Sequence, residues 1–219
     1  MTVKEIYGVP FSVDLDTTQG MRPDDDLDAV IPAILEVAGQ IAKEGVEISE
    51  GSATPVELSY LIKLVKSIGP APSILEIGMN AGMSTVAMLE AAPDATVVSY
   101  DLGEWECATR AAKLIQEKYG IRHEVVWGDS KVTLPRENRQ FDFGFVDGGH
   151  DTETAYSDIL FASKMCHMIM VDDTQFADVL EAVRLAERNG LIVQVDEGRD
   201  EGAWVNRRWA VFNCNGNQS

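Results

Sequence analysis

Short apolar runs alternate with segments of helical spacing over most of the chain after residue 70. Seven such runs favour β-strands, at residues 74–77, 96–100, 124–127, 141–146, 168–171, 191–195 and 209–213. Between them, apolar residues recur every three or four positions over 84–91, 108–119, 153–165 and 176–188, as they do along helices. This alternation predicts an α/β fold, a doubly wound and mainly parallel sheet with helices on both faces.

The two ends of this region carry further expectations. Residues 196–208 are too short for a comfortable crossover helix, so the last strand is predicted to pair antiparallel. Two amphipathic helices are expected earlier, over 24–44 and 54–69; Thr54 can cap the second, and Pro55 suits its first turn. We expect 1–69 to form an N-terminal helical cap and 70–219 the core of one compact domain, with 196–208 completing the cap. The acids at 24–28 suit a first helical turn better than a metal site.

Charge and cysteine content exclude several classes of protein. The chain has 18 basic and 36 acidic residues, a net charge of −18, which repels nucleic acid and anionic membrane surfaces. Cys107, Cys166 and Cys214 are far apart and form no CxxC pair, which excludes a disulfide framework and a thiolate zinc site. The first residues lack the apolar core of a signal peptide, and no apolar run could span a membrane. We expect a cytoplasmic protein with neither nucleic-acid nor membrane partners.

Acidic residues follow five successive predicted strands. In an open parallel sheet, ligands bind beyond the carboxyl ends of the strands, where the strand order reverses. The chemistry of this chain is therefore expected among the residues at these ends. They are Glu76, Gly78, Asn80, Gly82 and Ser84 after the first strand, Asp101 after the second, Asp129 and Ser130 after the third, Asp147 and His150 after the fourth, and Asp172 and Asp173 after the fifth.

The turn after the first strand suits a cationic ligand better than a dinucleotide. A pyrophosphate site would need GxGxxG, but Asn80 stands in place of the middle glycine and Met83 in place of the third. The carboxylate of Glu76 would repel phosphate and attract an ammonium or sulfonium group. Asp101 lies where an acid can accept both hydroxyls of a ribose. S-adenosylmethionine combines a sulfonium group, an ammonium group and a ribose.

The string ILEIGMNAGMST closely resembles the first motif of class I S-adenosylmethionine-dependent methyltransferases, and its EIGxNAGxS form is similar to the small-molecule O-methyltransferase branch. The resemblance covers roughly residues 52–213 and implies a Rossmann-like, seven-stranded sheet whose last strand is antiparallel. It implies the following cofactor contacts: Glu76, Gly78, Asn80, Gly82 and Ser84 to the methionine moiety, Asp101 to the ribose, and Asp129 with Ser130 to the adenine edge. The alternatives are a simple tight turn at the two glycines and a short helix capped by Asp129 and Ser130. Trp105 could stack on adenine or simply pack.

Three carboxylates at two adjacent strand ends predict a cation site. Neighbouring strands lie about 5 Å apart, so Asp147, Asp172 and Asp173 can converge on one point. Like charges this close repel, so some carboxylates must be protonated or a cation must lie among them. Oxygen ligands favour Mg²⁺ or another hard divalent cation. The alternative is that Asp173 caps the helix at 176–188 and only one aspartate faces the site.

His150 is predicted to be the general base, since imidazole titrates near neutral pH and can take the proton of a hydroxyl nucleophile. A divalent cation would offset the carboxylate charge and lower the pKa of a coordinated hydroxyl. The acids after the fourth and fifth strands resemble the metal site of catechol O-methyltransferase-like enzymes. The DxxH form is more similar to metal-dependent sugar O-methyltransferases of macrolide biosynthesis. That resemblance implies His150 as base and Asp147, Asp172 and Asp173 as metal ligands; the alternative for His150 is a helix-entry hydrogen bond.

The sequence thus predicts an S-adenosylmethionine-dependent methyltransferase acting on a hydroxyl of a small molecule of sugar or phenol type, assisted by Mg²⁺ and a histidine base. Trp204, Arg207 and Arg208 could line the acceptor pocket. A catalytically silent adenosine-ligand binding module and a nicotinamide-dependent oxidoreductase remain as alternatives. The acceptor and the oligomeric state stay open, with a homo-oligomer among the possibilities.

Overall fold

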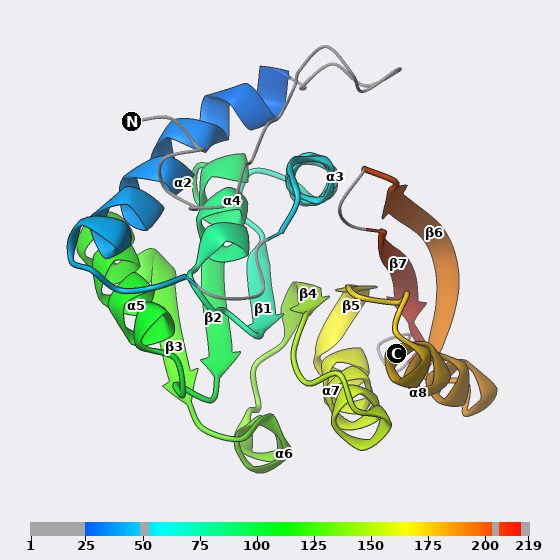
Figure 1. Cartoon of the computed structure of the whole chain (residues 1–219). Helices are drawn as coiled ribbons and strands as arrows, with labels where there is room; N and C mark the ends of the chain where they lie inside the picture. The colour runs from blue at the N-terminus through cyan, green and yellow to red at the C-terminus, as the bar shows by residue number, and fades with distance from the viewer. Residues whose placement is uncertain (1–24, 49–52, 203–205, 216–219) are drawn as a thin grey trace.

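A computed structural model describes residues 25–48, 53–202 and 206–215 of the chain; Trp204 and the first 24 residues lie outside this range. Its centre is a seven-stranded sheet in the order β3-β2-β1-β4-β5-β7-β6 (Figure 1). The strands are β1 Ser73–Ile77, β2 Thr96–Asp101, β3 His123–Trp127, β4 Phe141–Val146, β5 Cys166–Val171, β6 Ile192–Asp200 and β7 Arg207–Cys214. Strands β1 to β5 pair parallel, and β7 pairs antiparallel with β5 and β6. This confirms the predicted sheet and its antiparallel last strand.

Helices cover both faces of the sheet. They are α2 Asp25–Lys43, α3 Pro55–Ile68, α4 Met83–Ala91, α5 Glu106–Tyr119, α6 Ser130–Thr133, α7 Thr152–Met165 and α8 Ala177–Arg188. Helices α2, α3, α4 and α5 share one buried apolar cluster with the sheet, and α7 and α8 share a second cluster on the opposite face. The side chains of successive strand residues enter opposite clusters, as the pleat requires: Ile74 lies in the first and Leu75 in the second.

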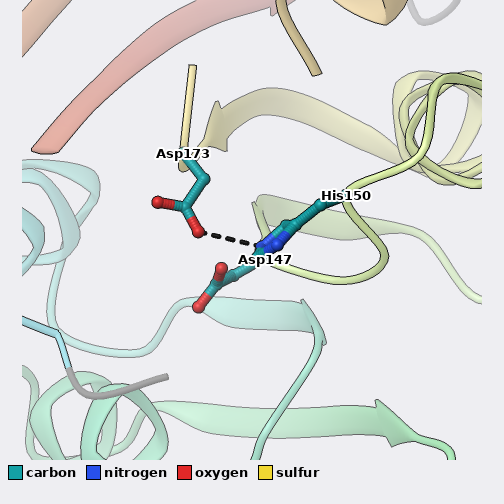
Figure 2. A group of neighbouring side chains, drawn as sticks. All are labelled: Asp147, His150 and Asp173. Carbon is teal, nitrogen blue, oxygen red and sulfur yellow. Dashed lines mark ion pairs between the residues drawn. The ribbon is translucent and has the colours of Figure 1, made fainter. Parts of the chain in front are cut away.

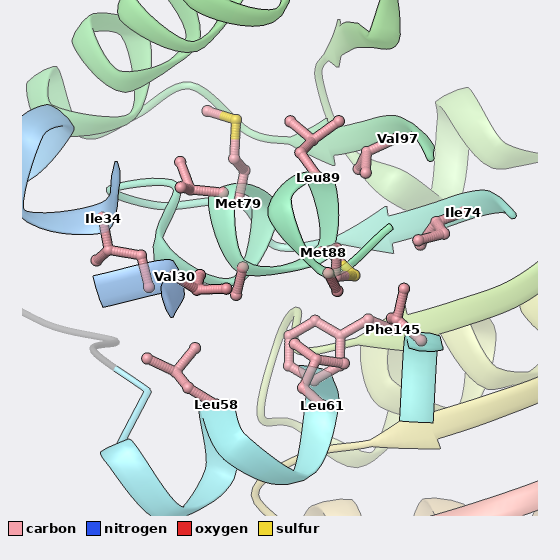
Figure 3. Packing of buried hydrophobic residues seen from close by; sticks show 14 of the residues in the cluster. Val30, Ile34, Leu58, Leu61, Ile74, Met79, Met88, Leu89, Val97 and Phe145 are labelled. Carbon is pink, nitrogen blue, oxygen red and sulfur yellow. The ribbon is translucent and has the colours of Figure 1, made fainter. Parts of the chain in front are cut away.

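The two N-terminal helices are part of the core. Ile41 of α2 and Leu61 and Ile62 of α3 have no exposed surface, and both helices pack against α4 (Figure 3). Burying one such side chain stabilises the fold by about 1.5–3 kcal/mol. These helices therefore do more than cover the strand ends.

The first turn of α3 is fixed by a capping box. The hydroxyl of Thr54 accepts a hydrogen bond from the backbone N–H of Glu57 at 3.3 Å, and the Glu57 carboxyl accepts one from the N–H of Thr54 at 3.3 Å. Pro55 occupies the first helical turn, where its missing N–H costs nothing. The predicted helix start is confirmed, and it sets the direction of the Glu57 side chain.

The expected long loop at 196–208 is wrong. Strand β6 continues to Asp200 and β7 begins at Arg207, so the two form a hairpin in which Asp200 pairs with Arg207. The extension was missed because residues 196–200 carry no large apolar side chain to signal a strand. Gly198 allows the hairpin to close, since a Cβ there would lie 2.2 Å from the indole nitrogen of Trp209. The hairpin brings Arg207 to the end of β5.

No helix among the described residues is long and apolar enough to cross a lipid bilayer.

Candidate active site

The strand order reverses between β1 and β4, and the loops that leave these two strands touch each other. Gly78 has φ 89°, a conformation that disfavours other residues, and a Cβ there would lie 1.9 Å from the carbonyl oxygen of Asp147. The N–H of Asp147 donates to the carbonyl of Ile77 at 2.8 Å. The glycine turn expected to bind the cofactor and the loop expected to carry out the chemistry are therefore in direct backbone contact.

Glu76 lies beneath the glycine turn. It has no exposed surface, and its carboxylate accepts hydrogen bonds from Ser84 at 2.6 Å, Thr85 at 2.7 Å and Ser99. Burial raises its pKa to about 7, and the three hydroxyl donors oppose that rise. Ser84 is also buried. Both side chains are thus bonded to each other inside the fold, and their predicted contact with the methionine moiety stays a prediction.

Asp101 shapes the same turn from the end of β2. One carboxylate oxygen accepts the backbone N–H groups of Met79 and Asn80, each at 3.0 Å, and the other accepts that of Gly103 at 2.8 Å. Asn80 has φ 46°, a left-handed conformation that asparagine tolerates better than most residues. The carboxylate thus lies against the turn, at the position predicted for ribose binding.

At the end of β3, Asp129 is the N-cap of α6 and accepts the N–H of Lys131 at 2.9 Å. The capping role weighed for Asp129 is therefore present, and α6 begins at Ser130 as that alternative required. Trp105 is 52% exposed beside the Asp101 loop, so its ring is free to meet a ligand. The buried Asp158 of α7 was not foreseen; burial raises its pKa to about 7, against an opposing influence of the nearby Ser130.

Asp147, His150 and Asp173 come together at the ends of β4 and β5 (Figure 2). One ligand-type atom from each lies within 4.8 Å of the others. Asp173 has φ 57°, so the chain turns out of the strand there and its side chain can face Asp147. His150 Nε2 lies 2.9 Å from Asp173 Oδ2. Asp173 does not cap α8, because Phe176 occupies the N-cap of that helix. His150 does not cap α7, because Asp151 does so.

Asp172 is not part of this three-residue group but lies next to it, near Arg207. It is 3% exposed, and its Oδ1 has no hydrogen-bond partner among the described residues. Arg207 lies between the two aspartates, with Nη1 at 4.0 Å from Asp172 Oδ2 and 2.6 Å from Asp173 Oδ1. Sequence reasoning placed Arg207 in an acceptor pocket; its ion pairs depend on the β6–β7 hairpin, which the sequence did not predict.

Burial and mutual repulsion raise the pKa of two of these acids. The pKa of Asp147 is well above its usual range because of burial and the neighbouring Asp172, and that of Asp172 rises to about 6 for similar reasons. For Asp173, burial is outweighed by hydrogen bonding to His150 and by Arg207, so its pKa is lowered. The bond to Asp173 in turn raises the pKa of His150.

A fourth carboxyl, that of Glu57, reaches this cluster from α3. It has no exposed surface, and its pKa is raised well above the usual range by burial and by Asp172. The capping-box spacing from Thr54 to Glu57 was visible in the sequence, but the packing of α3 against the sheet was needed to place the carboxyl here.

The donor set fits a hard divalent cation. It offers carboxylate oxygens, one of them on Asp172 buried without a donor, and a single imidazole nitrogen. In the described part of the chain, His150 and Arg207 are the cationic side chains that form salt bridges with the cluster. Together they offset at most two of the four negative charges that the cluster and Glu57 would carry if every carboxyl were ionised. A divalent cation would neutralise the remainder.

Comparison with known proteins agrees with this geometry. Residues 75–174 match a family model described as a methyltransferase domain. The fold matches an O-methyltransferase from Bacillus cereus in complex with SAH, at 20% identity over 87% of this chain and 91% of that one, with a TM-score of 0.66. It also matches the O-methyltransferase TomG from Streptomyces achromogenes, involved in tomaymycin synthesis and solved with SAM, at 18% identity over 98% and 99% of the two chains, with a TM-score of 0.65.

A search of curated protein sequences finds no match to the chain. The matched domain contains the glycine turn, Asp101 and the Asp147–His150–Asp173 group. Residues 75–174 are therefore similar to a methyltransferase domain, and the chain has the Rossmann-like fold of solved O-methyltransferases.

Proposed function

We propose that the protein transfers the methyl group of S-adenosylmethionine to a hydroxyl of a small molecule of sugar or phenol type, with His150 as general base and a divalent cation at the acids. The observation that carries this proposal is the pairing of His150 with Asp173 at 2.9 Å, next to Asp147, whose backbone touches the cofactor turn at Gly78. Base and methyl donor would thereby share one edge of the sheet.

The donor would lie along the ends of β1, β2 and β3. Gly78, Asn80 and Gly82 would hold the methionine moiety through their backbone, with Glu76 and Ser84 fixing the turn from beneath. Asp101 would accept the ribose hydroxyls, since a carboxylate oxygen can accept more than one hydrogen bond. Asp129 and Ser130 would meet the adenine edge.

His150 would take the proton of the acceptor hydroxyl. Its Nε2 faces Asp173, which favours the tautomer protonated at Nε2 and leaves Nδ1 free to accept a proton. The side chain is 52% exposed, so an acceptor can reach it. Asp173 would stabilise the imidazolium as it forms, and the ring of Phe176, centred 4.9 Å from the imidazole, restrains its orientation. General-base catalysis of this kind contributes about 10²–10⁴-fold.

Asp147, Asp172 and Asp173 would hold the cation, preferably Mg²⁺. When bound, it would supply Lewis-acid activation of the acceptor hydroxyl. Arg207 would keep Asp173 ionised and oriented whether or not the cation is present. Because His150 is close enough to act as a ligand, a His150→Gln variant must be assayed both for cation affinity and for turnover. Unchanged cation affinity with lost turnover supports the role of base.

The test is a mass-spectrometric screen of hydroxyl-bearing sugars, phenols and polyketides with deuteromethyl-labelled S-adenosylmethionine. The expected result is an acceptor that gains one labelled methyl group on oxygen with the wild-type protein and not with His150→Gln. Binding of S-adenosylmethionine without transfer to any acceptor would instead support a binding module.

A further inference from the structure

Near the Asp147–His150–Asp173 group, a carboxylate oxygen on each of two buried acids has no hydrogen-bond donor in the described part of the chain. The two oxygens are Oε1 of Glu57, on the first turn of α3, and Oδ1 of Asp172, at the end of β5. The two side chains are 0% and 3% exposed, and the carboxyls are near enough for each to affect the pKa of the other. Both groups are only acceptors when ionised, so the pair is satisfied either by a proton on one carboxyl or by a cation between the two.

The rest of the Glu57 side chain is already fixed. Its Oε2 accepts the N–H of Thr54 in the capping box, which leaves Oε1 as the oxygen without a partner among the described residues. An unpaired buried acceptor costs about 1–3 kcal/mol, and more when charged. A capping role alone would allow Glu57 to stay at the surface, as first-turn acids commonly do, so its complete burial against Asp172 needs a separate explanation.

Charge points to a cation as that explanation. Asp173 is engaged by both His150 and Arg207, whereas Arg207 approaches Asp172 only to 4.0 Å. Glu57, Asp172 and Asp147 are therefore less compensated than Asp173. Among hard ions, Mg²⁺, Mn²⁺ and Ca²⁺ take carboxylate oxygens as ligands.

We propose that Glu57 supplies an oxygen ligand to the divalent cation of this site, beside Asp172, so that the N-terminal helix α3 takes part in metal binding. This inference rests on the proposed function for the existence of the cation. It adds to that function a ligand from outside the matched methyltransferase domain, since residue 57 precedes residue 75.

The test measures Mn²⁺ binding to the metal-stripped full chain, by the loss of the free-ion electron paramagnetic resonance signal, without cofactor or acceptor. Glu57→Gln is the key variant because glutamine also forms a capping box and preserves the helix start. Glu181→Gln is the matched control: it removes the same charge from an exposed residue that pairs with Arg188. Asp147→Asn serves as the reference for losing the proposed site.

The expected result is Mn²⁺ binding to the wild type and to Glu181→Gln, and at least about tenfold weaker binding to Glu57→Gln. Unchanged affinity in Glu57→Gln together with weakened binding in Asp147→Asn would overturn the inference and leave the proposed cation site standing. If the wild type binds no Mn²⁺, the inference and the cation both fail. Methyl transfer in EDTA would then show that the transferase function survives without them.

A measurement on the wild type guards against a variant that fails to fold. Mg²⁺ should slow amide hydrogen exchange in the first turn of α3 as well as in the loops at 147–150 and 172–175, because a ligand bound by all three segments stabilises all three. Slower exchange confined to the two loops would contradict a role for Glu57.

Discussion

Replacing Glu76 with glutamine should make the stability of the protein less sensitive to pH. Glu76 is fully buried, and burial raises its pKa from 4.5 to about 7. The folded protein therefore holds this proton more tightly than the unfolded chain does. The contribution of Glu76 to stability is fully present below pH 4.5 and is lost as the pH rises towards and through the folded pKa of about 7.

The size of the effect follows from the two pKa values. A difference of one in pKa is worth about 1.36 kcal/mol, so the interval from 4.5 to about 7 corresponds to about 3 kcal/mol. Most of it, about 2–3 kcal/mol, is lost between about pH 5 and about pH 8. Glutamine has nearly the same volume and can bond the hydroxyls of Ser84, Thr85 and Ser99, but it does not titrate.

The assay is urea unfolding of the wild type and Glu76→Gln at about pH 5 and at about pH 8. The wild type should lose about 2–3 kcal/mol more than the variant on going to the higher pH. Other buried acids titrate in both proteins, so their contributions cancel in the comparison. Equal losses would refute the reasoning, because they would mean that the three hydroxyl donors stabilise the ionised carboxylate enough to offset its burial.

Further predictions concern the site itself. His150→Gln should lower kcat about 10²–10⁴-fold with little change in S-adenosylmethionine affinity, as measured by kinetics and calorimetry; full turnover would exclude the base role. In the metal-free protein, an NMR titration should place the pKa of His150 above the ordinary histidine value of 6.5, because the hydrogen bond to Asp173 raises it; a pKa at or below 6.5 would contradict this. Gly78→Ala should destabilise the fold by at least about 2 kcal/mol through its positive φ and its clash with Asp147, and an unchanged melting temperature would contradict this. EDTA should abolish methyl transfer and Mg²⁺ should restore it; product formed in EDTA would remove the cation from the mechanism.

Much of the fold could be predicted because the buried strands are continuous apolar runs. Strand 141–146 was predicted with its observed bounds, and the antiparallel last strand followed from a short connection. The end of β6 could not be predicted in this way. Residues 196–200 form an edge strand stabilised by backbone pairing with β7, and such pairing leaves no apolar pattern in the sequence.

The candidate site was predictable where residues follow strand ends and less so where distant elements meet. The positions of Asp147, His150 and Asp173 follow from strand order, and the structure brings these three together. The contacts of Arg207 depend on hairpin register, and the place of Glu57 depends on how α3 packs. Neither leaves a local signal, because both depend on contacts between residues far apart in the chain.

The contact between Gly78 and the carbonyl of Asp147 has a thermodynamic consequence: it couples the affinity for the methyl donor to the affinity for the acceptor substrate. With no side chain between the two loops, a displacement of one is passed directly to the other. A donor that tightens the first loop must therefore alter the affinity of the second for its substrate, and the substrate must alter donor affinity by the same factor. Measuring each dissociation constant in the presence of the other ligand would reveal this reciprocity.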